Sequence, residues 1–264
     1  MNVAIVKYNA GNIYSVVNAL KRLGITPELT DDAERLSKAD RVLFPGQGEA
    51  GSTMAYLRSR GLDRLIRDLK QPVLGICIGQ QLMCSHSEES DTDCLGIFDT
   101  EVLKFRPEKH EDKVPHMGWN TLTRTSSPLF KGFGTDEFVY FVHSYYVPVN
   151  PYTIAVTDYV VPFSAALHKD NFYATQFHPE KSGSVGERIL KRRAAKDSRV
   201  KRLQKRLACL GYDAGEPDGV FGAQTEAAVR GFQKISGAQF GLKVDGIVGN
   251  QTKEALTYPR KWLL

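Results

Sequence analysis

Short apolar runs alternate with amphipathic helical patterns over the first eighty residues, and this alternation restricts the possible folds more than any other feature of the sequence. Residues 3–6, 41–44 and 73–76 are predicted to be buried strands. A helical pattern follows the first strand, with apolar residues on one face of residues 13–23 and a glycine, Gly24, at its end. A chain that repeats strand and helix in this way favours a parallel sheet with helices on both faces.

The pattern changes in the second half of the chain. Residues 139–142, 153–156, 164–167 and 173–177 are predicted to be short strands separated by turns, which is typical of antiparallel pairing. We therefore expect an α/β fold with a mixed, mostly parallel central sheet and helices on both faces.

The distribution of charge indicates two domains. The net charge of the whole chain is +5, but residues 1–190 carry 20 Lys and Arg against 23 Asp and Glu, whereas residues 191–264 carry 15 against 7. The sequence becomes polar and basic over residues 191–197, where we place the linker. The predicted domains are therefore residues 1–193 and residues 194–264.

The second domain is predicted to be small and all-α. An apolar stripe between Val200 and Leu210 indicates its first helix, with Ser198 as the N-cap. Residues 218–228 are repeated at residues 245–255, each copy holding an Asp-Gly turn, a second glycine and a helix start. Two copies are too few for a solenoid, so we expect a three-helix unit.

Composition excludes several classes of protein. Hydrophobic residues make up 42% and charged residues 25% of the 264 residues, which is ordinary for a folded domain and not for a disordered chain. No apolar run approaches the roughly 18 residues of a membrane-spanning helix, and the N-terminus has no signal-peptide pattern. The four cysteines show no Cys-x-x-Cys spacing, so we expect free thiols in the cytoplasm, no metal and no membrane.

One of these thiols has the setting of a nucleophile. Cys77 lies at a predicted strand-to-helix junction between Gly75 and Gly79, which is the thiol counterpart of the Gly-x-Ser-x-Gly elbow. The N-terminus of the following helix favours the thiolate form. A structural buried cysteine is the competing interpretation, but the two glycines favour the nucleophile. The other cysteines lack this setting and are expected in the core: Cys84, Cys94 and Cys209.

A thiolate nucleophile needs a base that also protonates the leaving group. His178 ends a predicted strand and Glu180 follows two residues later, so both side chains point the same way in extended backbone. The carboxylate can then hold the imidazole in the required tautomer. Backbone N–H groups of Gly46 and Gly48, after a strand expected beside that of Cys77, can stabilise an oxyanion. An ordinary strand-to-helix loop explains these two glycines equally well.

Together these residues resemble the class I, triad-type glutamine amidotransferases. The shared pattern is Pro-Gly-x-Gly, then Gly-x-Cys-x-Gly-x-Gln, then His-x-Glu. Within that class, residues 1–190 are similar to the glutaminase subunits of imidazole glycerol phosphate synthase. Four segments carry this similarity: residues 9–12, 115–120, 143–146 and 177–182. Gln47 and Ile78 depart from the usual family residues, which implies a changed rate and not a lost activity.

The resemblance implies a role for each site residue. Cys77 would attack the side-chain amide of glutamine, His178 would protonate the departing ammonia and later activate water, and Glu180 would orient His178. The residues around the amide carbonyl and the oxyanion would be Gly46, Gly48 and Ile78. The residues around the glutamine backbone would be Gln81, Ser144 and Tyr145, with Glu89 at its amino group. The residues at a partner interface would be Asn12, Trp119, Asn120 and Lys181.

The implied partner is a separate (β/α)8 cyclase subunit, with which the chain would form a heterodimer. Ammonia would pass to the cyclase and react with a phosphoribulosyl-formimino intermediate, giving imidazole glycerol phosphate and an aminoimidazole carboxamide ribotide in histidine biosynthesis. No cofactor is implied. Two alternatives stay open. The same glutaminase chemistry can serve another acceptor, such as a sugar or another synthase. The chain can also be an interaction or envelope-binding protein that acts through its second domain.

Residues 198–258 resemble the peptidoglycan-binding-like three-helix module, through the two Asp-Gly repeats and a Leu-Gly-Tyr segment at residues 210–212. A shared fold does not imply wall binding. The basic run between Lys191 and Arg206 suits phosphate contacts, but charge runs are usually solvated faces and no base-reading motif accompanies this one. We therefore do not expect nucleic-acid binding.

Overall fold

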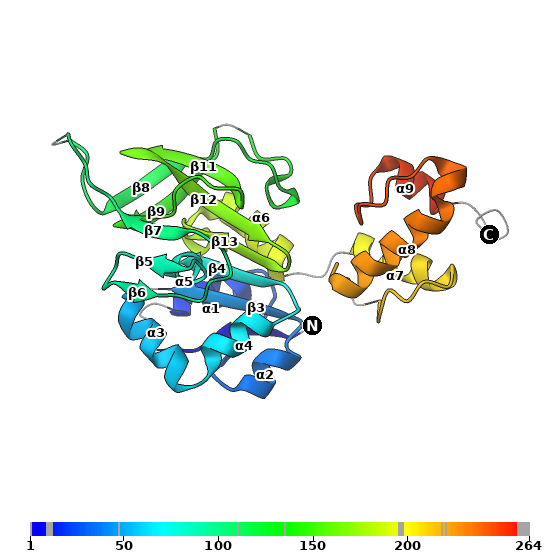
Figure 1. Cartoon of the computed structure of the whole chain (residues 1–264), viewed down its shortest axis with the longest axis horizontal. Coiled ribbons are helices and arrows are strands. Elements are labelled where there is room, and N and C mark those ends of the chain that lie inside the picture. Colours follow the sequence, from blue (N-terminus) through cyan, green and yellow to red (C-terminus); the bar gives the residue numbers. More distant parts are fainter. Residues whose placement is uncertain are drawn as a thin grey trace. The chain divides into compact units, whose positions relative to one another are not determined.

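The computed structural model (Figure 1) describes residues 2–8, 13–46, 48–109, 111–134, 136–194, 198–217, 219 and 221–257. The chain forms two compact units, residues 2–195 and residues 196–264. Each unit has its own apolar core.

A seven-stranded sheet lies at the centre of the first unit, with the order β11-β12-β13-β4-β3-β1-β2. Its strands are β1 (Val3–Val6), β2 (Glu28–Thr30), β3 (Arg41–Gly46), β4 (Val73–Cys77), β11 (Thr153–Tyr159), β12 (Val161–Lys169) and β13 (Phe172–Thr175). The five strands from β13 to β2 are parallel, while β11 and β12 are antiparallel to their neighbours. The predicted mixed, mostly parallel sheet is confirmed.

Helices cover both faces of this sheet (Figure 1). They are α1 (Ile13–Arg22), α2 (Ala33–Lys38), α3 (Ala50–Ser59), α4 (Leu62–Asp68), α5 (Ile78–Leu82) and α6 (Gly183–Ala194). Strand β1 is buried throughout, and its alternate residues join different cores. Val3 and Ile5 pack in the same cluster as Leu20 of α1, whereas Ala4 and Val6 pack in the cluster that contains residues of α2 to α5. Burial on both faces explains why the strand is a continuous apolar run.

Two smaller sheets complete the first unit. One joins β8 (His116–Thr121) to β9 (Phe138–His143) in antiparallel register. The other has the order β10-β7-β5-β6, with β5 (His86–Ser87), β6 (Thr92–Asp93), β7 (Glu101–Lys104) and β10 (Tyr145–Tyr146). Two short 3-10 turns are η1 (Pro128–Phe130) and η2 (Pro179–Lys181). The strand predicted at residues 139–142 thus exists, but it pairs with β8 outside the central sheet, and β8 itself was not expected.

The second unit contains three helices in its described part: α7 (Ser198–Cys209), α8 (Ala223–Phe240) and α9 (Asn250–Ala255). Its core gathers apolar residues from all three helices, including Leu207, Val229, Phe232 and Ala255. Of the residues in the predicted stripe, Leu207 and Leu210 are buried in this core. Ser198 is the first residue of α7.

The internal repeat has a structural counterpart in two buried glutamines. Gln204 accepts a hydrogen bond from the Gly219 amide at 2.8 Å and donates to Thr225 at 3.1 Å. Gln233 accepts from the Gly246 amide at 2.9 Å and donates to Thr252 at 3.3 Å. Each glutamine therefore joins its own helix to the following Asp-Gly turn and to the start of the next helix. The unit is built from two overlapping copies of one helix-turn-helix arrangement.

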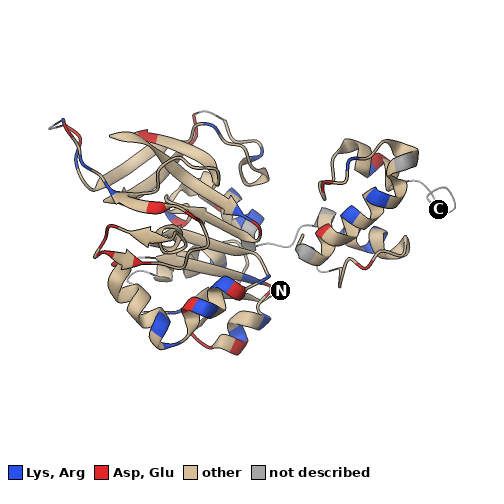
Figure 2. Cartoon of the chain, in the orientation of Figure 1, with Lys and Arg blue, Asp and Glu red and all other residues tan. Residues whose placement is uncertain are grey.

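The basic residues of the tail are partly structural. Lys and Arg mark the surface of α7 in Figure 2. One of them, Arg206, donates from Nε to the carbonyl of Leu256 at 2.6 Å and so connects α7 to the residue after α9. Arg192, which belongs to the same predicted run, donates to the carbonyl of Leu129 in the first unit. Within the described residues, no helix is long and apolar enough to cross a lipid bilayer.

Candidate active site

The backbone at Cys77 forms the elbow that the sequence predicts. Cys77 is the last residue of β4 and immediately precedes α5, and its φ of 54° and ψ of −110° lie in a region that non-glycine residues rarely adopt. Such strain is characteristic of a nucleophile held at a sharp strand-to-helix turn. The thiol is half-buried, and its Sγ lies 3.8 Å from the carbonyl oxygen of Val142 and 3.7 Å from Nε2 of Gln176.

Glycines let two strand ends and a helix meet at this point. Gly46, the last residue of β3, lies directly beside Cys77 in the parallel register. A Cβ on Gly46 would overlap the side chain of Ile78, and a Cβ on Gly79 would overlap the carbonyl oxygen of Phe44. Gly46 and Ile78 therefore contact each other where the resemblance places the oxyanion. Gly48 is exposed beyond the end of β3.

His178 and Glu180 lie together beneath the sheet edge. His178 Nδ1 is 2.7 Å from Oε1 of Glu180, and the exposed fractions of the two side chains are only 2% and 3%. The carboxylate can only accept, so Nδ1 carries the proton and Nε2 is the basic nitrogen. Within the described residues Nε2 has no oxygen or nitrogen partner, which leaves it free to exchange a proton with the thiol and the leaving group.

The charges of the site keep His178 protonated. Burial alone lowers the pKa of the imidazole, but the neighbouring Cys77 thiolate and the Glu180 carboxylate outweigh burial and raise this pKa. His178 is therefore an imidazolium at neutral pH, beside the sulfur of Cys77. The site thus holds the acid that a departing amine requires next to its nucleophile.

Hydrogen bonds from neighbouring elements hold the triad in place. The amide of His178 donates to the carbonyl of Tyr140 in β9 at 2.9 Å. The hydroxyl of Ser182 donates to the carbonyl of His178 at 2.6 Å and accepts from the amide of Tyr140 at 3.0 Å. A small cavity adjoins the imidazole and the carboxylate. Its walls are formed by Ile13, Val16, Pro45, Gly46, Ile76, His178 and Glu180.

The residues assigned to the glutamine backbone gather on the other side of Cys77. Gln81, buried in α5, donates from Nε2 to the carbonyl of Tyr145 at 2.9 Å and to Oε1 of Gln176 at 3.0 Å. The carbonyl of Ser144 accepts from the amide of Phe105 at 3.0 Å. Gln81 therefore joins the Ser144–Tyr145 segment, through Gln176, to the Cys77 thiol.

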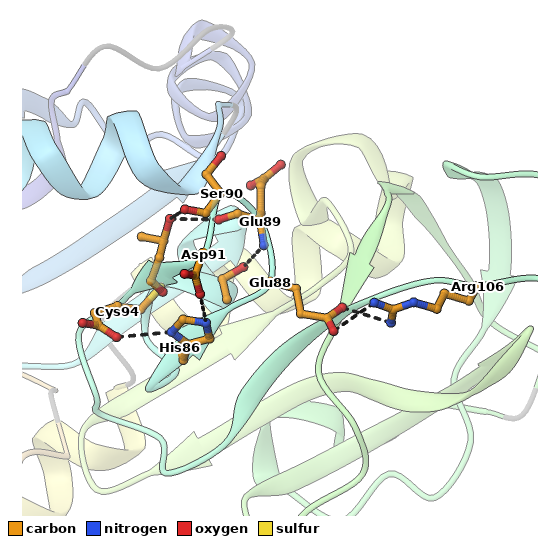
Figure 3. Close-up of polar contacts among 10 residues, drawn as sticks. His86, Glu88, Glu89, Ser90, Asp91, Cys94 and Arg106 are labelled. Carbon is orange, nitrogen blue, oxygen red and sulfur yellow. Dashed lines mark hydrogen bonds and ion pairs between the residues drawn. The ribbon is translucent and has the colours of Figure 1, made fainter.

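Glu89 lies in the loop between β5 and β6, and Figure 3 shows its neighbourhood. Glu88 pairs with Arg106 at 3.0 Å, whereas the Glu89 carboxylate points away from that pair and accepts from the Ala50 amide at 2.9 Å. Burial and the charge of Glu49 raise the pKa of Glu89. The charges of Glu89, Glu88 and Glu49 also act on the Tyr145 hydroxyl, whose pKa is raised by burial first and by these carboxylates second. This negative region suits an α-ammonium group.

Two of the expected partner residues share the outward face of the β8–β9 sheet. Trp119 is 55% exposed and packs edge-on against Tyr140 at 5.8 Å, and Lys181 Nζ lies 5.8 Å from the same ring. Asn120 has the opposite orientation, because alternate residues of a strand face opposite sides. Its Nδ2 donates to the carbonyl of Asp158 at 3.1 Å. Asn12 lies outside the described residues, as does Gln47.

Sequence reasoning did not assign three residues that touch the site. Gln176 contacts the Cys77 thiol, and the histidine His143 supports the carbonyl of Tyr145. The hydroxyl of Tyr8, which is buried, donates to the carbonyl of Pro45 beside Gly46. Of the three, Gln176 could have been found from the sequence, because it lies two positions before His178 and so on the same face of the predicted strand.

The other cysteines differ from expectation in one case. Cys84 is fully buried and Cys94 is half-buried, but Cys209 is exposed near the end of α7, so its expected core position is wrong. The apolar face of α7 turns Leu207 and Leu210 inward and thereby turns Cys209 outward. Among the described residues, no group of three His, Cys, Asp or Glu could hold a metal ion.

Comparison with known proteins identifies the first unit. Residues 4–196 match the family described as glutamine amidotransferase class-I, which is well over half of the chain. The chain belongs to this family. Solved structures agree on the fold of the amidotransferase: that of a putative GMP synthase component from Thermoplasma acidophilum has a TM-score of 0.54 at 21% identity, and covers 72% of this chain and 91% of that one.

Several relatives of the amidotransferase are subunits of one synthase. The imidazole glycerol phosphate synthase subunit HisH of Bacteroides fragilis is 68% identical over 191 residues, which is 72% of this chain and 97% of the relative. The HisH subunit of Escherichia coli strain K12 is 45% identical over 193 residues, which is 72% of this chain and 97% of that relative. The predicted family resemblance, fold class and enzyme class are confirmed. Residues 196–256 match a different family, described as putative peptidoglycan binding domain.

Proposed function

We propose that the amidotransferase is the glutaminase subunit of an imidazole glycerol phosphate synthase and works in the cytoplasm on L-glutamine. The contact that carries the chemistry is the 2.7 Å bond between His178 and Glu180, with the strained Cys77 beside the imidazole. The 68% identity to a HisH subunit supports the choice of synthase. We further propose residues 1–193 as the glutaminase domain and residues 194–264 as the linker and appended domain.

The reaction follows from the protonation states of the triad. The Cys77 thiolate adds to the side-chain amide carbon of glutamine, and backbone groups near Gly46 and Ile78 stabilise the oxyanion. His178 donates its Nε2 proton to the amide nitrogen, so that the C–N bond breaks, ammonia leaves and a glutamyl thioester forms. His178 then takes a proton from water, and the water oxygen attacks the thioester. The C–S bond breaks to release glutamate and the Cys77 thiolate, which leaves His178 protonated again. Glu180 stabilises the imidazolium throughout.

A partner surface lies on the outward face of the β8–β9 sheet. Cross-strand register places Met117 beside Val142, Trp119 beside Tyr140 and Thr121 beside Phe138. Met117, Trp119 and Phe138 are each more than half exposed, which makes this face an apolar patch of the kind that binds another protein. We propose that the cyclase docks on this face over Trp119 and Lys181 and receives the ammonia. Asn12 is also proposed at the interface, as is Asn120, although the Asn120 side chain faces the other side of β8.

The proposal is tested by substituting the nucleophile. Cys77→Ala should abolish glutamine hydrolysis by the full-length chain, both alone and with a cyclase and its phosphorylated substrate. Cys209→Ala is the matched control, because Cys209 is exposed and belongs to the second unit. Glutamate release is measured for the wild type and both variants. Residual turnover by Cys77→Ala would contradict the mechanism, and a wild type that the cyclase does not stimulate would contradict the choice of partner.

A further inference from the structure

Two histidines that the mechanism does not use are buried beside the glutamine site. His116 of β8 and His143 of β9 face each other across the strand pair, on the inward face of the sheet, and are 4% and 6% exposed. Aromatic rings enclose them: Tyr159 stacks on His116 at 3.9 Å, and Phe163 lies edge-on to His143 at 5.1 Å. Polar groups in such surroundings are costly unless they are hydrogen-bonded.

Their hydrogen bonds run in one direction. Nδ1 of His143 lies 2.7 Å from the carbonyl oxygen of Tyr145, and Nε2 of His143 lies 3.1 Å from Nδ1 of His116. Burial lowers the pKa of His116 to about 4, and burial first, with the charges of His116 and His178, lowers that of His143 to about 3. Both rings are therefore neutral at physiological pH, with one donor and one acceptor each.

The protonation pattern follows from the carbonyl. An oxygen of this kind only accepts, so Nδ1 of His143 carries the proton and Nε2 is unprotonated. Nε2 then accepts from Nδ1 of His116, whose own Nε2 faces Nδ2 of Asn120 at 3.5 Å. The chain of donors thus begins at Asn120 on β8 and ends at the Tyr145 carbonyl.

The receiving carbonyl belongs to the segment beside the nucleophile. The carbonyl of Tyr145 accepts a second hydrogen bond, from Gln81, and Gln81 is joined through Gln176 to the Cys77 thiol. The carbonyl of Val142, one residue before His143, lies 3.8 Å from Cys77 Sγ. His143 therefore holds a short stretch of backbone whose two ends both reach the catalytic centre.

We propose that His143, oriented by His116, is a positioning residue for the glutamine site, which fixes the Tyr145 carbonyl and with it the Ser144–Tyr145 segment that receives the substrate backbone. The inference rests on the proposed glutaminase function. Leucine or phenylalanine would fill an aromatic core equally well, and what the imidazole adds is a directed donor to one main-chain oxygen.

Two isosteric variants separate this role from simple packing. In His143→Asn the amide nitrogen replaces Nδ1 and keeps the bond to Tyr145, but the acceptor for His116 is lost. In His143→Gln the amide occupies the position of Nε2, so the acceptor for His116 is kept and the donor to Tyr145 is lost. If the pair served only to stabilise the core, His143→Gln would impair glutamine turnover less than His143→Asn, because it keeps the hydrogen bond from His116. Positioning of the substrate segment requires the opposite order.

The measurement is glutamine turnover by the full-length chain with the cyclase. His143→Gln should raise KM for glutamine by about tenfold, the worth of one strong buried hydrogen bond, with kcat within about twofold. His143→Asn should leave KM within about twofold of the wild type. Equal increases in KM, a larger increase for His143→Asn, or a loss confined to kcat would overturn the proposal.

A second readout does not depend on ammonia transfer. Iodoacetamide alkylates Cys77, and glutamine protects it; peptide mass spectrometry separates Cys77 from the half-buried Cys94 and the exposed Cys209. The half-protecting glutamine concentration should rise about tenfold only in His143→Gln, while alkylation without glutamine stays unchanged. If glutamine protects Cys77 of the wild type but no ammonia reaches the cyclase, the choice of partner is wrong and the positioning role of His143 is unaffected. A changed alkylation rate without glutamine would overturn the positioning role.

Discussion

At the scale of single residues, the carboxylate of Glu180 helps to raise the pKa of His178, after the larger effect of Cys77. The carboxylate is almost fully buried and lies 2.7 Å from Nδ1 of the imidazole, so its charge acts on His178 with little screening by water. Together with the thiolate it keeps His178 protonated against the effect of burial. Protonated His178 is the form that releases ammonia.

Glu180→Gln should therefore change both rate and pH profile. The amide keeps the shape but removes the charge and the preferred tautomer, so kcat should fall by about 10²- to 10⁴-fold. Removal of a charge that raises the pKa of His178 lowers that pKa, so the alkaline limb of kcat/KM should move to lower pH. A pH series of glutamine hydrolysis measures both effects. Glu34→Gln, at an exposed position of α2, is the control; an unchanged alkaline limb in Glu180→Gln would contradict this account.

The triad was accessible from sequence because its parts are local. Cys77 lies between two glycines at one junction, and His178 and Glu180 are two residues apart, so short patterns suffice to find them. Gln176 and Tyr8 were missed because their contacts depend on which strands are neighbours; Gln176, for example, reaches Cys77 only because β13 lies parallel beside β4. His143 contacts Tyr145 only two residues away, but its place in the site depends on the pairing of β9 with β8, which the sequence pattern did not predict.

At the scale of elements, β3, β4 and α5 pack closely where they meet at the nucleophile. The end of β3 lies so close to the first turn of α5 that Gly79 has no room for a methyl group against the carbonyl of Phe44. The strained backbone of Cys77 is stabilised by this packing. Stability and the presentation of the nucleophile are therefore coupled here.

Gly79→Ala should destabilise the first unit by about 2–3 kcal/mol or more and reduce activity, because a backbone carbonyl cannot move aside as a side chain can. Gly134→Ala is the matched control, since a Cβ on Gly134 meets no atom within 4 Å. Urea unfolding of the two variants and the wild type gives the difference in free energy. Equal stability of Gly79→Ala and Gly134→Ala would show that the junction yields more easily than its geometry implies.

The central strands were predictable, whereas β8 was not. Strands β1, β3 and β4 are short apolar runs, buried on both faces and followed by helices, and such runs are recognisable without any tertiary information. In β8 the inward positions hold His116, Gly118 and Asn120 and the outward ones hold Met117 and Trp119. This arrangement inverts the usual pattern of apolar residues inside and polar residues outside, and it agrees with the proposed docking of the cyclase on the outward face.

At the scale of the whole molecule, the chain combines two units with separate cores and different charge. Lys191, Arg192 and Arg193 belong to α6, so the first unit holds 23 Lys and Arg against 23 Asp and Glu, whereas residues 196–264 hold 12 against 7. Helix α6 closes the first unit, with Ile189 and Leu190 buried in the cores of the amidotransferase. The HisH subunit of Bacteroides fragilis aligns over 191 residues, 97% of its own length, which is about the length of the first unit.

A chain that ends at Ala194, after α6, should therefore fold and keep its glutaminase activity. Its thermal midpoint should lie within a few degrees of the first transition of the full-length protein, because no core residue of the first unit is removed. Calorimetry and glutamine turnover with the cyclase measure these outcomes. Aggregation of the shortened chain, or loss of its stimulation by the cyclase, would show that the appended helices are part of the working enzyme.

The two faces of the β8–β9 sheet also limit how this part of the gene can change in length. Trp119 faces outward and His116 faces inward, three positions apart, because successive residues of a strand alternate between its faces. An insertion or deletion of one residue between them would place both side chains on one face, with either the histidine turned toward the partner or the tryptophan turned into the aromatic core. Insertions within this strand are therefore expected only in even numbers of residues, whichever side chains occupy it.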